Sequence, residues 1–371
     1  MAPSDHINSR NCWLNYPGKI PETEIWKREE SYQVVTTQEN PATVNSLYFG
    51  DNLPILKLIL PTYKGKVDLI YVDPPFGTGQ HFSNYGEETA YEDSLLNHHF
   101  LEFLRQRILL LKAFLSERGS FYLHIDKKIG HYVKLICDEV FGFENFLNDI
   151  TRIKCNPKNF SRKAYGSQTD MVLFYANNRD QHIWNEIKLP LSEEEVGKLF
   201  PKKERKKGSY TTHPLHAPGE TKEGDTGKLW KGLSPPPGRH WRYQRAVLDK
   251  LDEEGLIEWS DTGNPRKKVF AQDHPGKKIQ DIWEFKDKGL SYVSYPTEKN
   301  REFLQQLILQ SSHAESLVMD AFAGSGGTLW VAEQLGRKWI GIDQSDKAQE
   351  VLLTHCRDHQ LMPNMYHLQK K

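Results

Sequence analysis

The sequence is poor in the features that mark secreted, metal-binding and membrane proteins. Its four cysteines, Cys12, Cys137, Cys155 and Cys356, are widely spaced, and no Cys-x-x-Cys pair occurs. This spacing favours reduced thiols over a disulfide framework or a zinc site. No apolar run reaches the roughly 18 residues that a membrane-spanning helix needs. Because Met1 is not followed by a basic start and an apolar core, we expect a cytoplasmic protein without a secretory signal.

An excess of positive charge is also missing. The 49 Lys and Arg residues are balanced by 49 Asp and Glu residues, so the formal net charge is zero. Affinity for nucleic acids normally appears as an excess of basic residues, so such a substrate would need a local basic patch. No Gly-Lys-Ser/Thr follows a glycine-rich turn, which excludes a P-loop. The length of 371 residues suits one large α/β domain with a smaller inserted domain.

Residues 69–77 read Leu-Ile-Tyr-Val-Asp-Pro-Pro-Phe-Gly and are the most informative stretch that is present. The apolar, β-rich run over residues 67–72 predicts a buried strand that ends before Asp73. The two prolines that follow Asp73 lack N–H donors and fix φ, so they hold Asp73 and Phe76 in a stiff, extended segment. Ligands of open α/β sheets bind at this end of the strands. On this motif alone, a strand-ending turn with Asp73 as a cap and Phe76 in the core is the alternative.

A second motif lies far along the chain, where residues 317–328 read Leu-Val-Met-Asp-Ala-Phe-Ala-Gly-Ser-Gly-Gly-Thr. The pattern predicts a buried strand, a glycine-rich turn and a helix over residues 329–335. Glycines permit a tight turn and let a ligand approach bare backbone. The next predicted strand, residues 338–343, ends in Asp343. An acid at this distance from the glycines suits the ribose hydroxyls of a nucleoside-type cofactor.

Together the two motifs resemble the S-adenosylmethionine-dependent amino-methyltransferases of DNA, which carry an Asp-Pro-Pro-aromatic catalytic motif and a Phe-x-Gly-x-Gly cofactor loop. The order of the motifs is similar to the β class, which includes HinfI-like, cell-cycle-regulated and type III modification enzymes. The resemblance covers residues 44–180 and 290–360. It implies an α/β, Rossmann-like methyltransferase sheet, mostly parallel and circularly ordered, with an inserted target-recognition region. The expected parts are an N-terminal arm (1–43), a catalytic half (44–180), a target-recognition insert (181–288) and a cofactor-binding half (289–371).

The resemblance further implies site-specific methyl transfer to the N6 amine of adenine in DNA, with the target base flipped out of the duplex. The Asp73 carboxylate and the Pro74 carbonyl would accept hydrogen bonds from the amine, and Pro75 would keep both acceptors rigid. Phe76 would stack on the base. The chemistry needs neither a metal ion nor a catalytic cysteine.

The residues expected to bind S-adenosylmethionine lie at strand ends and in the adjoining loops. They are Asp51, Asp73, Thr78, Pro296, Thr297, Lys299, Asp320, Phe322, Ala323, Gly324, Ser325, Gly326, Thr328 and Asp343. For Asp51, capping of the helix that follows is an equal alternative. Thr297 is also expected to cap a helix that runs to Gln310, and Lys299 has a surface position as its alternative.

The predicted insert carries basic runs at residues 201–207 and 234–243, interleaved with aromatic residues. Such composition fits contacts with phosphates and bases, and we expect duplex DNA as the partner. The DNA-contacting residues would include Lys206, Lys207, Arg239 and Arg242. Solvated charge around a small aromatic core, with Trp241 as a member, is the alternative. A homodimer and a cognate restriction endonuclease are compatible partners, and a prokaryotic type of localisation at the nucleoid is expected.

Other functions compete with this interpretation. The N4 amine of cytosine is the nearest alternative, although relatives of that kind more often carry Ser-Pro-Pro-aromatic where this chain has Asp73. An exocyclic amine in RNA is a further alternative substrate. A nicotinamide-dependent oxidoreductase could use the loop at Gly324 and Asp343, but it leaves the motif at Asp73 unexplained. A DNA-binding specificity protein without catalysis is disfavoured by the intact motifs.

Overall fold

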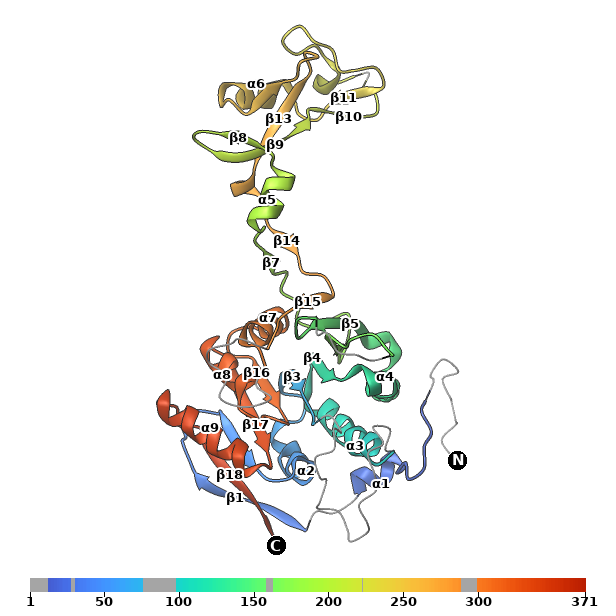
Figure 1. The fold of residues 1–371 in the computed structure, drawn as a ribbon, viewed down its shortest axis with the longest axis vertical. Coiled ribbons are helices and arrows are strands. Elements are labelled where there is room, and N and C mark those ends of the chain that lie inside the picture. Colours follow the sequence, from blue (N-terminus) through green and yellow to red (C-terminus); the bar gives the residue numbers. More distant parts are fainter. Residues whose placement is uncertain (1–12, 28–30, 76–97, 158–162, 222, 288–298) are drawn as a thin grey trace. The chain divides into compact units, whose positions relative to one another are not determined.

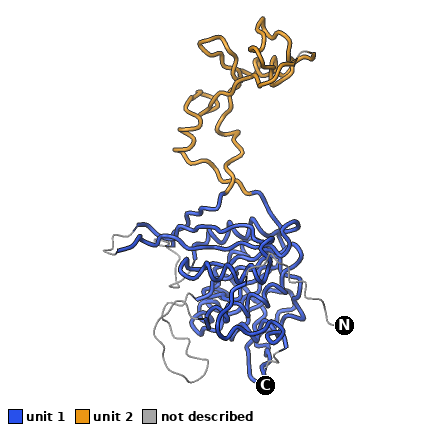
Figure 2. Tube along the Cα trace, turned by 90° about the vertical axis from the view of Figure 1, so that its right-hand side faces the viewer, with its two compact units in different colours: residues 1–186, 280–371 blue, residues 187–279 orange. Residues whose placement is uncertain are grey.

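The computed structural model describes residues 13–27, 31–75, 98–157, 163–221, 223–287 and 299–371 (Figure 1). These residues form two compact units, which Figure 2 shows in different colours. Unit 1 combines residues 1–186 with residues 280–371, and unit 2 comprises residues 187–279. Unit 2 therefore lies inside the range predicted for the recognition insert. Within the described ranges, no helix has the length and apolar character needed to cross a bilayer.

Unit 1 is built on a ten-stranded sheet with the order β1-β18-β2-β17-β16-β3-β4-β6-β5-β15. The strands are β1 Tyr32–Gln38, β2 Ser46–Phe49, β3 Val67–Val72, β4 Leu115–Ile125, β5 Phe146–Ile153, β6 Thr169–Ala176, β15 Ile282–Glu284, β16 Leu317–Asp320, β17 Lys338–Asp343 and β18 Asn364–Lys370. The six strands from β18 to β4 are parallel to their neighbours. Strand β6 is antiparallel to both β4 and β5, and β1 is antiparallel to β18. The prediction of a mostly parallel Rossmann-like sheet is confirmed.

Helices cover both faces of this sheet (Figure 1). They are α1 Glu22–Lys27, α2 Asn52–Tyr63, α3 His98–Phe114, α4 Lys127–Phe141, α7 Arg301–Ser311, α8 Gly327–Gln334 and α9 Asp346–Asp358. Side chains alternate between the faces of a strand, and β3 shows which helices lie on each side. Ile70 and Val72 pack into the main core with residues of α2, α3 and α4. Between them, Tyr71 points to the other face and meets the Phe303 ring of α7 at 6.1 Å.

Some elements differ from the sequence-based expectations. Residues 32–38, inside the predicted arm, form an edge strand of the main sheet, because β1 pairs with β18 along its length. Helix α3 passes directly into a strand, since it ends at Phe114 and β4 begins at Leu115. Helix α7 starts at Arg301, and its cap is Asn300, whose Oδ1 accepts hydrogen bonds from two backbone N–H groups. The prediction that Thr297 caps this helix is therefore wrong. Asparagine is as good a cap as threonine.

Unit 2 has small antiparallel sheets of its own. A four-stranded sheet has the order β12-β13-β9-β8. Strands β10 and β11 form a separate two-stranded sheet, as do β14 and β7. The elements are β7 Lys188–Leu189, α5 Glu193–Leu199, β8 Lys202–Glu204, β9 Gly208–Pro214, β10 His216–Pro218, β11 Arg239–Trp241, α6 Arg245–Glu253, β12 Ile257–Trp259, β13 Pro265–Phe270 and β14 Lys277–Lys278. Trp230 and Trp241 are each 1% exposed and form an aromatic core with Leu248 of α6. The small aromatic core considered as an alternative is thus present.

Candidate active site

Four carboxylates lie at the ends of four neighbouring parallel strands. The strands β2, β17, β16 and β3 are adjacent in that order. Asp343 is the last residue of β17 and Asp320 the last of β16, while Asp73 directly follows β3 and Asp51 lies just beyond β2. In the register of the sheet, Asp320 is level with Tyr71 of β3. Because all four strands run the same way, their carboxyl ends gather the acids at one edge of the sheet.

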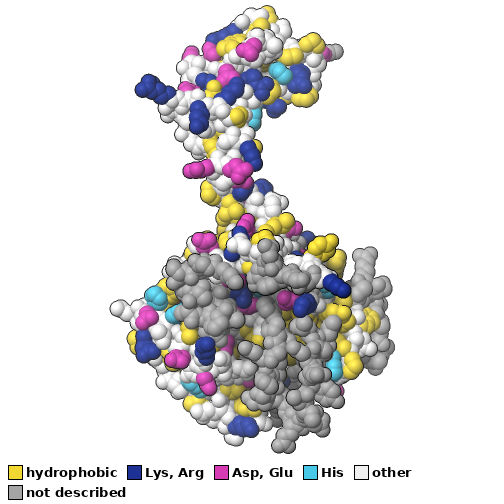
Figure 3. All heavy atoms as spheres, in the orientation of Figure 1, with side chains coloured by type: hydrophobic (Ala, Val, Ile, Leu, Met, Phe, Trp, Pro, Cys, Tyr) yellow, Lys and Arg dark blue, Asp and Glu magenta, His cyan; other side chains and the backbone are white. Residues whose placement is uncertain are grey.

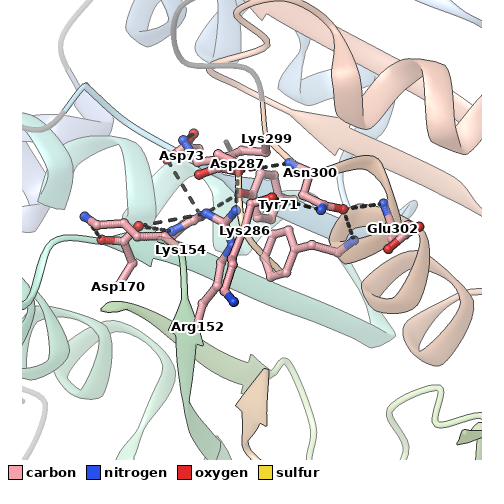
Figure 4. Close-up of polar contacts among 12 residues, drawn as sticks. Tyr71, Asp73, Arg152, Lys154, Asp170, Lys286, Asp287, Lys299, Asn300 and Glu302 are labelled. Carbon is pink, nitrogen blue, oxygen red and sulfur yellow. Dashed lines mark hydrogen bonds and ion pairs between the residues drawn. The ribbon is translucent and has the colours of Figure 1, made fainter. Parts of the chain in front are cut away.

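Asp73 holds a carboxylate whose two oxygens differ. Its Oδ2 forms an ion pair with Lys299, the residue that precedes the cap of α7. Its Oδ1 is buried and, among the residues that the structure describes, receives no hydrogen bond. Pro74 is buried behind it, and Pro75 is exposed. Figure 4 shows Asp73 near Lys299, in one group of polar side chains with Arg152 of β5 and Asp170 of β6. The carboxylate therefore has one oxygen held by Lys299, Oδ2, and one oxygen, Oδ1, that can accept a hydrogen bond from a ligand.

Beneath Asp73 lies a fully buried histidine. His124, on β4, is 0% exposed, and its Nδ1 is 4.0 Å from Asp73 Oδ1. The same Nδ1 forms a hydrogen bond of 2.9 Å with the Tyr71 hydroxyl, and Nε2 forms one of 3.2 Å with Asp170 Oδ2. Burial lowers the pKa of His124, more than the hydrogen bond with Asp170 raises it. The imidazole is therefore neutral near pH 7.

The polar chain continues from Asp170 into strand β5 and the segment after β15. Asp170 Oδ1 accepts a hydrogen bond from Lys154, and Arg152 approaches Asp170 Oδ2 at 3.9 Å. Arg152 is 0% exposed and forms an ion pair with Asp287. Asp287 Oδ1 also accepts the backbone N–H of Asn300 at 3.2 Å. These contacts connect Asp73 to the segment that leads into α7 (Figure 4).

The glycine turn after β16 is shaped by two left-handed residues. Gly324 has φ +52° and Gly326 has φ +81°, which side-chain-bearing residues rarely adopt. A Cβ on Gly326 would lie 2.4 Å from Leu352 Cδ2 of α9, whereas one on Gly324 would make only an ordinary contact, at 3.9 Å, with the Phe322 carbonyl oxygen. Asp343 Oδ2 accepts the Gly324 N–H at 2.7 Å, and its Oδ1 accepts the Ser345 N–H at 2.8 Å. The strand-end acid thus fixes the turn, and its carboxylate retains acceptor capacity for a further donor.

Asp320 is the most deeply buried acid of the edge, at 2% exposure. Burial raises its pKa to about 7, although hydrogen bonds with Thr328 and the Phe322 N–H oppose the rise. The charges of Asp73 and Asp343 raise it further. No Lys or Arg in the described parts of the chain forms an ion pair with Asp320. A carboxylate in this position is suited to a cationic ligand.

Asp51 has two structural partners. Its Oδ1 accepts the Leu53 N–H at 2.9 Å, which caps α2, and Arg107 Nη2 at 2.7 Å. Arg107 comes from α3, and its guanidinium lies 3.5 Å from the centre of the Phe103 ring. Asn52 then donates to the Ala321 carbonyl at 2.7 Å, which joins this corner to the turn after β16. The capping role considered for Asp51 is present, and a cofactor role stays a prediction.

Unit 2 carries a local excess of basic residues. Residues 187–279 contain 19 Lys and Arg against 14 Asp and Glu, although the whole chain is neutral. Figure 3 shows Lys and Arg side chains gathered over this unit. Several of its lysines are neutralised by carboxylates, as in the ion pairs Lys202–Glu258 and Lys231–Asp252. The local patch that a neutral chain needs for a nucleic-acid substrate is therefore available.

A basic cluster forms where β10 and β11 pair. Burial lowers the pKa of His216, and the charges of Arg239, Arg242 and Arg266 lower it further. Arg239 Nη1 is 3.0 Å from His216 Nδ1. None of the three arginines forms an ion pair with a described carboxylate. Arg239 and Arg242 are exposed. We call His216, Arg239, Arg242 and Arg266 the basic cluster.

The other predicted DNA-contacting residues lie at the turn between β8 and β9. Lys206 is exposed there, and Lys207 is half-buried with its ammonium 5.5 Å from the Phe270 ring centre. Trp230 and Trp241 are core residues and are unavailable for stacking on bases. Trp259 is 42% exposed, but its ring is stacked on Trp230 at 5.8 Å.

The structure brings most of the predicted site residues together at one sheet edge. Around the turn after β16, Ala323, Ser325 and Thr328 are buried and Phe322 is half-buried. Lys299 is placed against Asp73. Four predicted residues lie outside the described ranges: Phe76, Thr78, Pro296 and Thr297.

Sequence reasoning missed three residues that shape the site, His124, Asp170 and Arg107. For His124 a signal exists, since it lies near the end of β4, whose second half is a β-rich run in the sequence. Asp170 stands at the start of an antiparallel strand, and only the pairing of β6 with β4 places it beside His124. Arg107 occupies a helix position that the apolar pattern leaves unassigned.

A Rossmann-like sheet with a glycine turn and four strand-end acids defines the class as a methyltransferase fold. Residues 67–353 match the model of a protein family described as DNA methylase. The chain is 39% identical over 341 residues to type II methyltransferase M.EcaI of Enterobacter cloacae, which covers 90% of this chain and 75% of that protein. This chain therefore belongs to the DNA methylase family.

Two further relatives extend the comparison. The Mod subunit of type III restriction-modification enzyme StyLTI of Salmonella typhimurium is 26% identical over 366 residues, or 89% of this chain and 55% of that subunit. The DNA adenine methyltransferase YhdJ of Escherichia coli K12 is 24% identical over 304 residues, or 80% of this chain and 78% of that protein. The resemblance to DNA methyltransferases drawn from the two motifs is confirmed.

Proposed function

We propose that this protein transfers a methyl group from S-adenosylmethionine to the exocyclic N6 amine of adenine in DNA. The observation that carries the proposal is the buried Oδ1 of Asp73, an acceptor without a described donor at the end of β3. An exocyclic amine presents N–H donors, which such an oxygen can accept. The relative whose printed name specifies adenine, YhdJ, supports the choice of base.

The edge of the sheet fits S-adenosylmethionine. Asp320, a buried carboxylate without a described cationic partner, would receive the ammonium group of the methionine part. Gly324 and Gly326 would let that part approach the backbone, because neither residue carries a side chain at the turn. Asp343 would accept the ribose hydroxyls with its remaining lone pairs. When bound, the cofactor supplies the electrophilic methyl group of its sulfonium.

The protein's own contribution to the transfer is positioning and charge stabilisation. Asp73 Oδ1 and the Pro74 carbonyl would accept the two N–H groups of the amine, which directs the nitrogen lone pair toward the cofactor. Positive charge develops on the nitrogen as it becomes tetrahedral, and the Asp73 carboxylate stabilises it. Lys299 holds Oδ2, so that the carboxylate presents Oδ1 in a fixed direction. Pro74 and Pro75 keep the acceptors from turning away.

The target base must leave the duplex to reach Asp73, at a cost of a few kcal/mol of unstacking and unpairing. We assign the DNA contacts to unit 2, through Lys206, Lys207 and the basic cluster with Arg239 and Arg242. Phosphate contacts of this kind fix the protein on the duplex. We also propose a cognate restriction endonuclease, a homodimer and action at the nucleoid in the cytoplasm, on the strength of the restriction-modification relatives.

The test is to incubate the pure protein with S-adenosylmethionine and mixed-sequence DNA, digest the DNA, and identify methylated nucleosides by mass spectrometry. An Asp73→Ala variant purified in the same way controls for contaminating methylases. N6-methyladenine that requires Asp73 would support the proposal. N4-methylcytosine would retain the mechanism but change the base. Absence of any methylated nucleoside, despite cofactor binding, would overturn the proposed activity on DNA.

A further inference from the structure

In the buried hydrogen-bonded chain next to Asp73, the atom that carries each proton can be assigned. Asp170 forms hydrogen bonds with His124 and Lys154, and Figure 4 shows its contact with Lys154. Burial raises the pKa of Asp170, but these hydrogen bonds and charges bring it down to about 2. Asp170 is therefore a carboxylate, which can only accept. The proton between Asp170 and His124 must belong to His124 Nε2.

That assignment fixes the remaining protons. A neutral imidazole carries one proton, so with Nε2 protonated, His124 Nδ1 is an acceptor. Burial raises the pKa of Tyr71 well above its usual value, so its hydroxyl keeps its proton. The 2.9 Å contact is then a hydrogen bond from the Tyr71 O–H to His124 Nδ1. The Tyr71 proton is thus directed to His124, and Nδ1 carries no proton that it could donate to Asp73 Oδ1.

We propose that Asp170 and His124 are positioning residues that keep Asp73 Oδ1 free of a protein donor, so that it stays available to the amine. This inference rests on the proposed function. In the opposite tautomer, the proton would sit on His124 Nδ1, which lies 4.0 Å from Asp73 Oδ1, and a small shift would bring the two atoms into hydrogen-bonding distance. The amine would then compete with an internal donor for the same lone pairs.

Replacing Asp170 by Asn should reverse the tautomer. Lys154 is a donor and would hold the amide oxygen on its side, which turns the amide NH₂ toward His124 Nε2. Nε2 must then accept, and the ring proton moves to Nδ1. Because a hydrogen bond from His124 to the Asp73 carboxylate would compete with the amine, we expect kcat to fall about 10- to 100-fold, which corresponds to about 1.4–2.7 kcal/mol. The KM for S-adenosylmethionine should stay close to that of the wild type.

Two matched variants separate this role from a purely structural one. Lys154→Met removes the other partner of the same carboxylate but leaves Oδ2 to accept from His124, so tautomer and kcat should be retained. Tyr71→Phe deletes a donor without adding one near Asp73, so kcat should stay within a few-fold of the wild type.

The tautomer can be measured directly by ¹⁵N NMR of histidine-labelled protein, with His124→Gln identifying the resonance. We expect Nε2–H in the wild type and Nδ1–H in Asp170→Asn. A wild-type ring protonated at Nδ1 would overturn the inference without any variant. So would an Asp170→Asn enzyme with an altered tautomer and an unchanged kcat, which would leave the proposed function intact. A wild type that methylates no nucleic acid overturns the proposed function instead, and the positioning role falls with it.

Discussion

The strand-end site of unit 1 and the basic surface of unit 2 use charged residues in opposite ways. In unit 1, Asp73, Asp320 and Asp343 are partly or fully buried, and most of their oxygens have assigned partners. In unit 2, Arg239 and Arg242 are exposed and have no described carboxylate partner. A buried charge affects catalysis through a single short contact, because the low dielectric strengthens that contact. Exposed charges affect DNA affinity through their number, since each phosphate contact contributes a similar, salt-dependent amount. Substitutions should therefore have steep effects in unit 1 and graded effects in unit 2.

The largest effect should follow replacement of Asp73 by Asn. The amide places an N–H₂ group near the amine and removes the charge that stabilises the transition state. Loss of one such stabilising contact costs about 10²–10³ in kcat. Cofactor affinity should change little, which equilibrium binding of S-adenosylmethionine can check.

Asp126→Asn is the matched control for this substitution. Asp126 follows β4 as Asp73 follows β3, but its Oδ1 only accepts the Lys128 N–H at 2.8 Å as the cap of α4. Asparagine caps a helix equally well, so activity should be retained. Equal losses in both variants would remove the distinction between Asp73 and an ordinary strand-end acid.

A graded effect is expected from the double substitution of Arg239 and Arg242 by Gln. Each lost phosphate contact should reduce the salt dependence of DNA binding by about 0.9 in the slope of log K against log salt. The double variant should therefore lose about two units of slope, measured by fluorescence anisotropy at several salt concentrations, with kcat at saturating DNA retained.

The double substitution of Lys202 and Lys231 by Gln removes the same charge from the same unit. Both lysines are already paired, with Glu258 and Asp252 respectively. Their loss should leave the slope nearly unchanged. If both double variants weakened binding alike, net charge would decide affinity and the basic cluster would have no special role.

The comparison also explains what could be predicted from the sequence. Two strands were predictable from apolar, β-rich runs in the sequence. One run stops just before Asp73 and the proline pair, and the other stops at Asp343. Polar edge strands such as residues 32–38 lack that pattern, and their partner lies at the far end of the chain. The contact of His124 with Asp170 depends on the antiparallel insertion of β6, which no local pattern encodes. Local sequence thus predicts which functional residues lie at the ends of strands. The pairing of the strands decides which of these residues come into contact.

The smallest effect concerns the pH dependence of stability through Asp320. Burial raises its folded-state pKa to about 7, whereas an unfolded Asp titrates near about 3.9. The folded protein therefore binds an extra proton between these values. The contribution of Asp320 to stability is fully present below the unfolded pKa and is lost as pH rises through about 7.

An Asp320→Asn variant lacks this group. From pH 5 to pH 8, the free energy of unfolding of the variant should therefore fall less than that of the wild type, by on the order of 1–3 kcal/mol. Saturating S-adenosylmethionine should shrink the wild-type loss, because its ammonium favours the ionised carboxylate. Parallel pH profiles for the two proteins would show that Asp320 is ionised across the range.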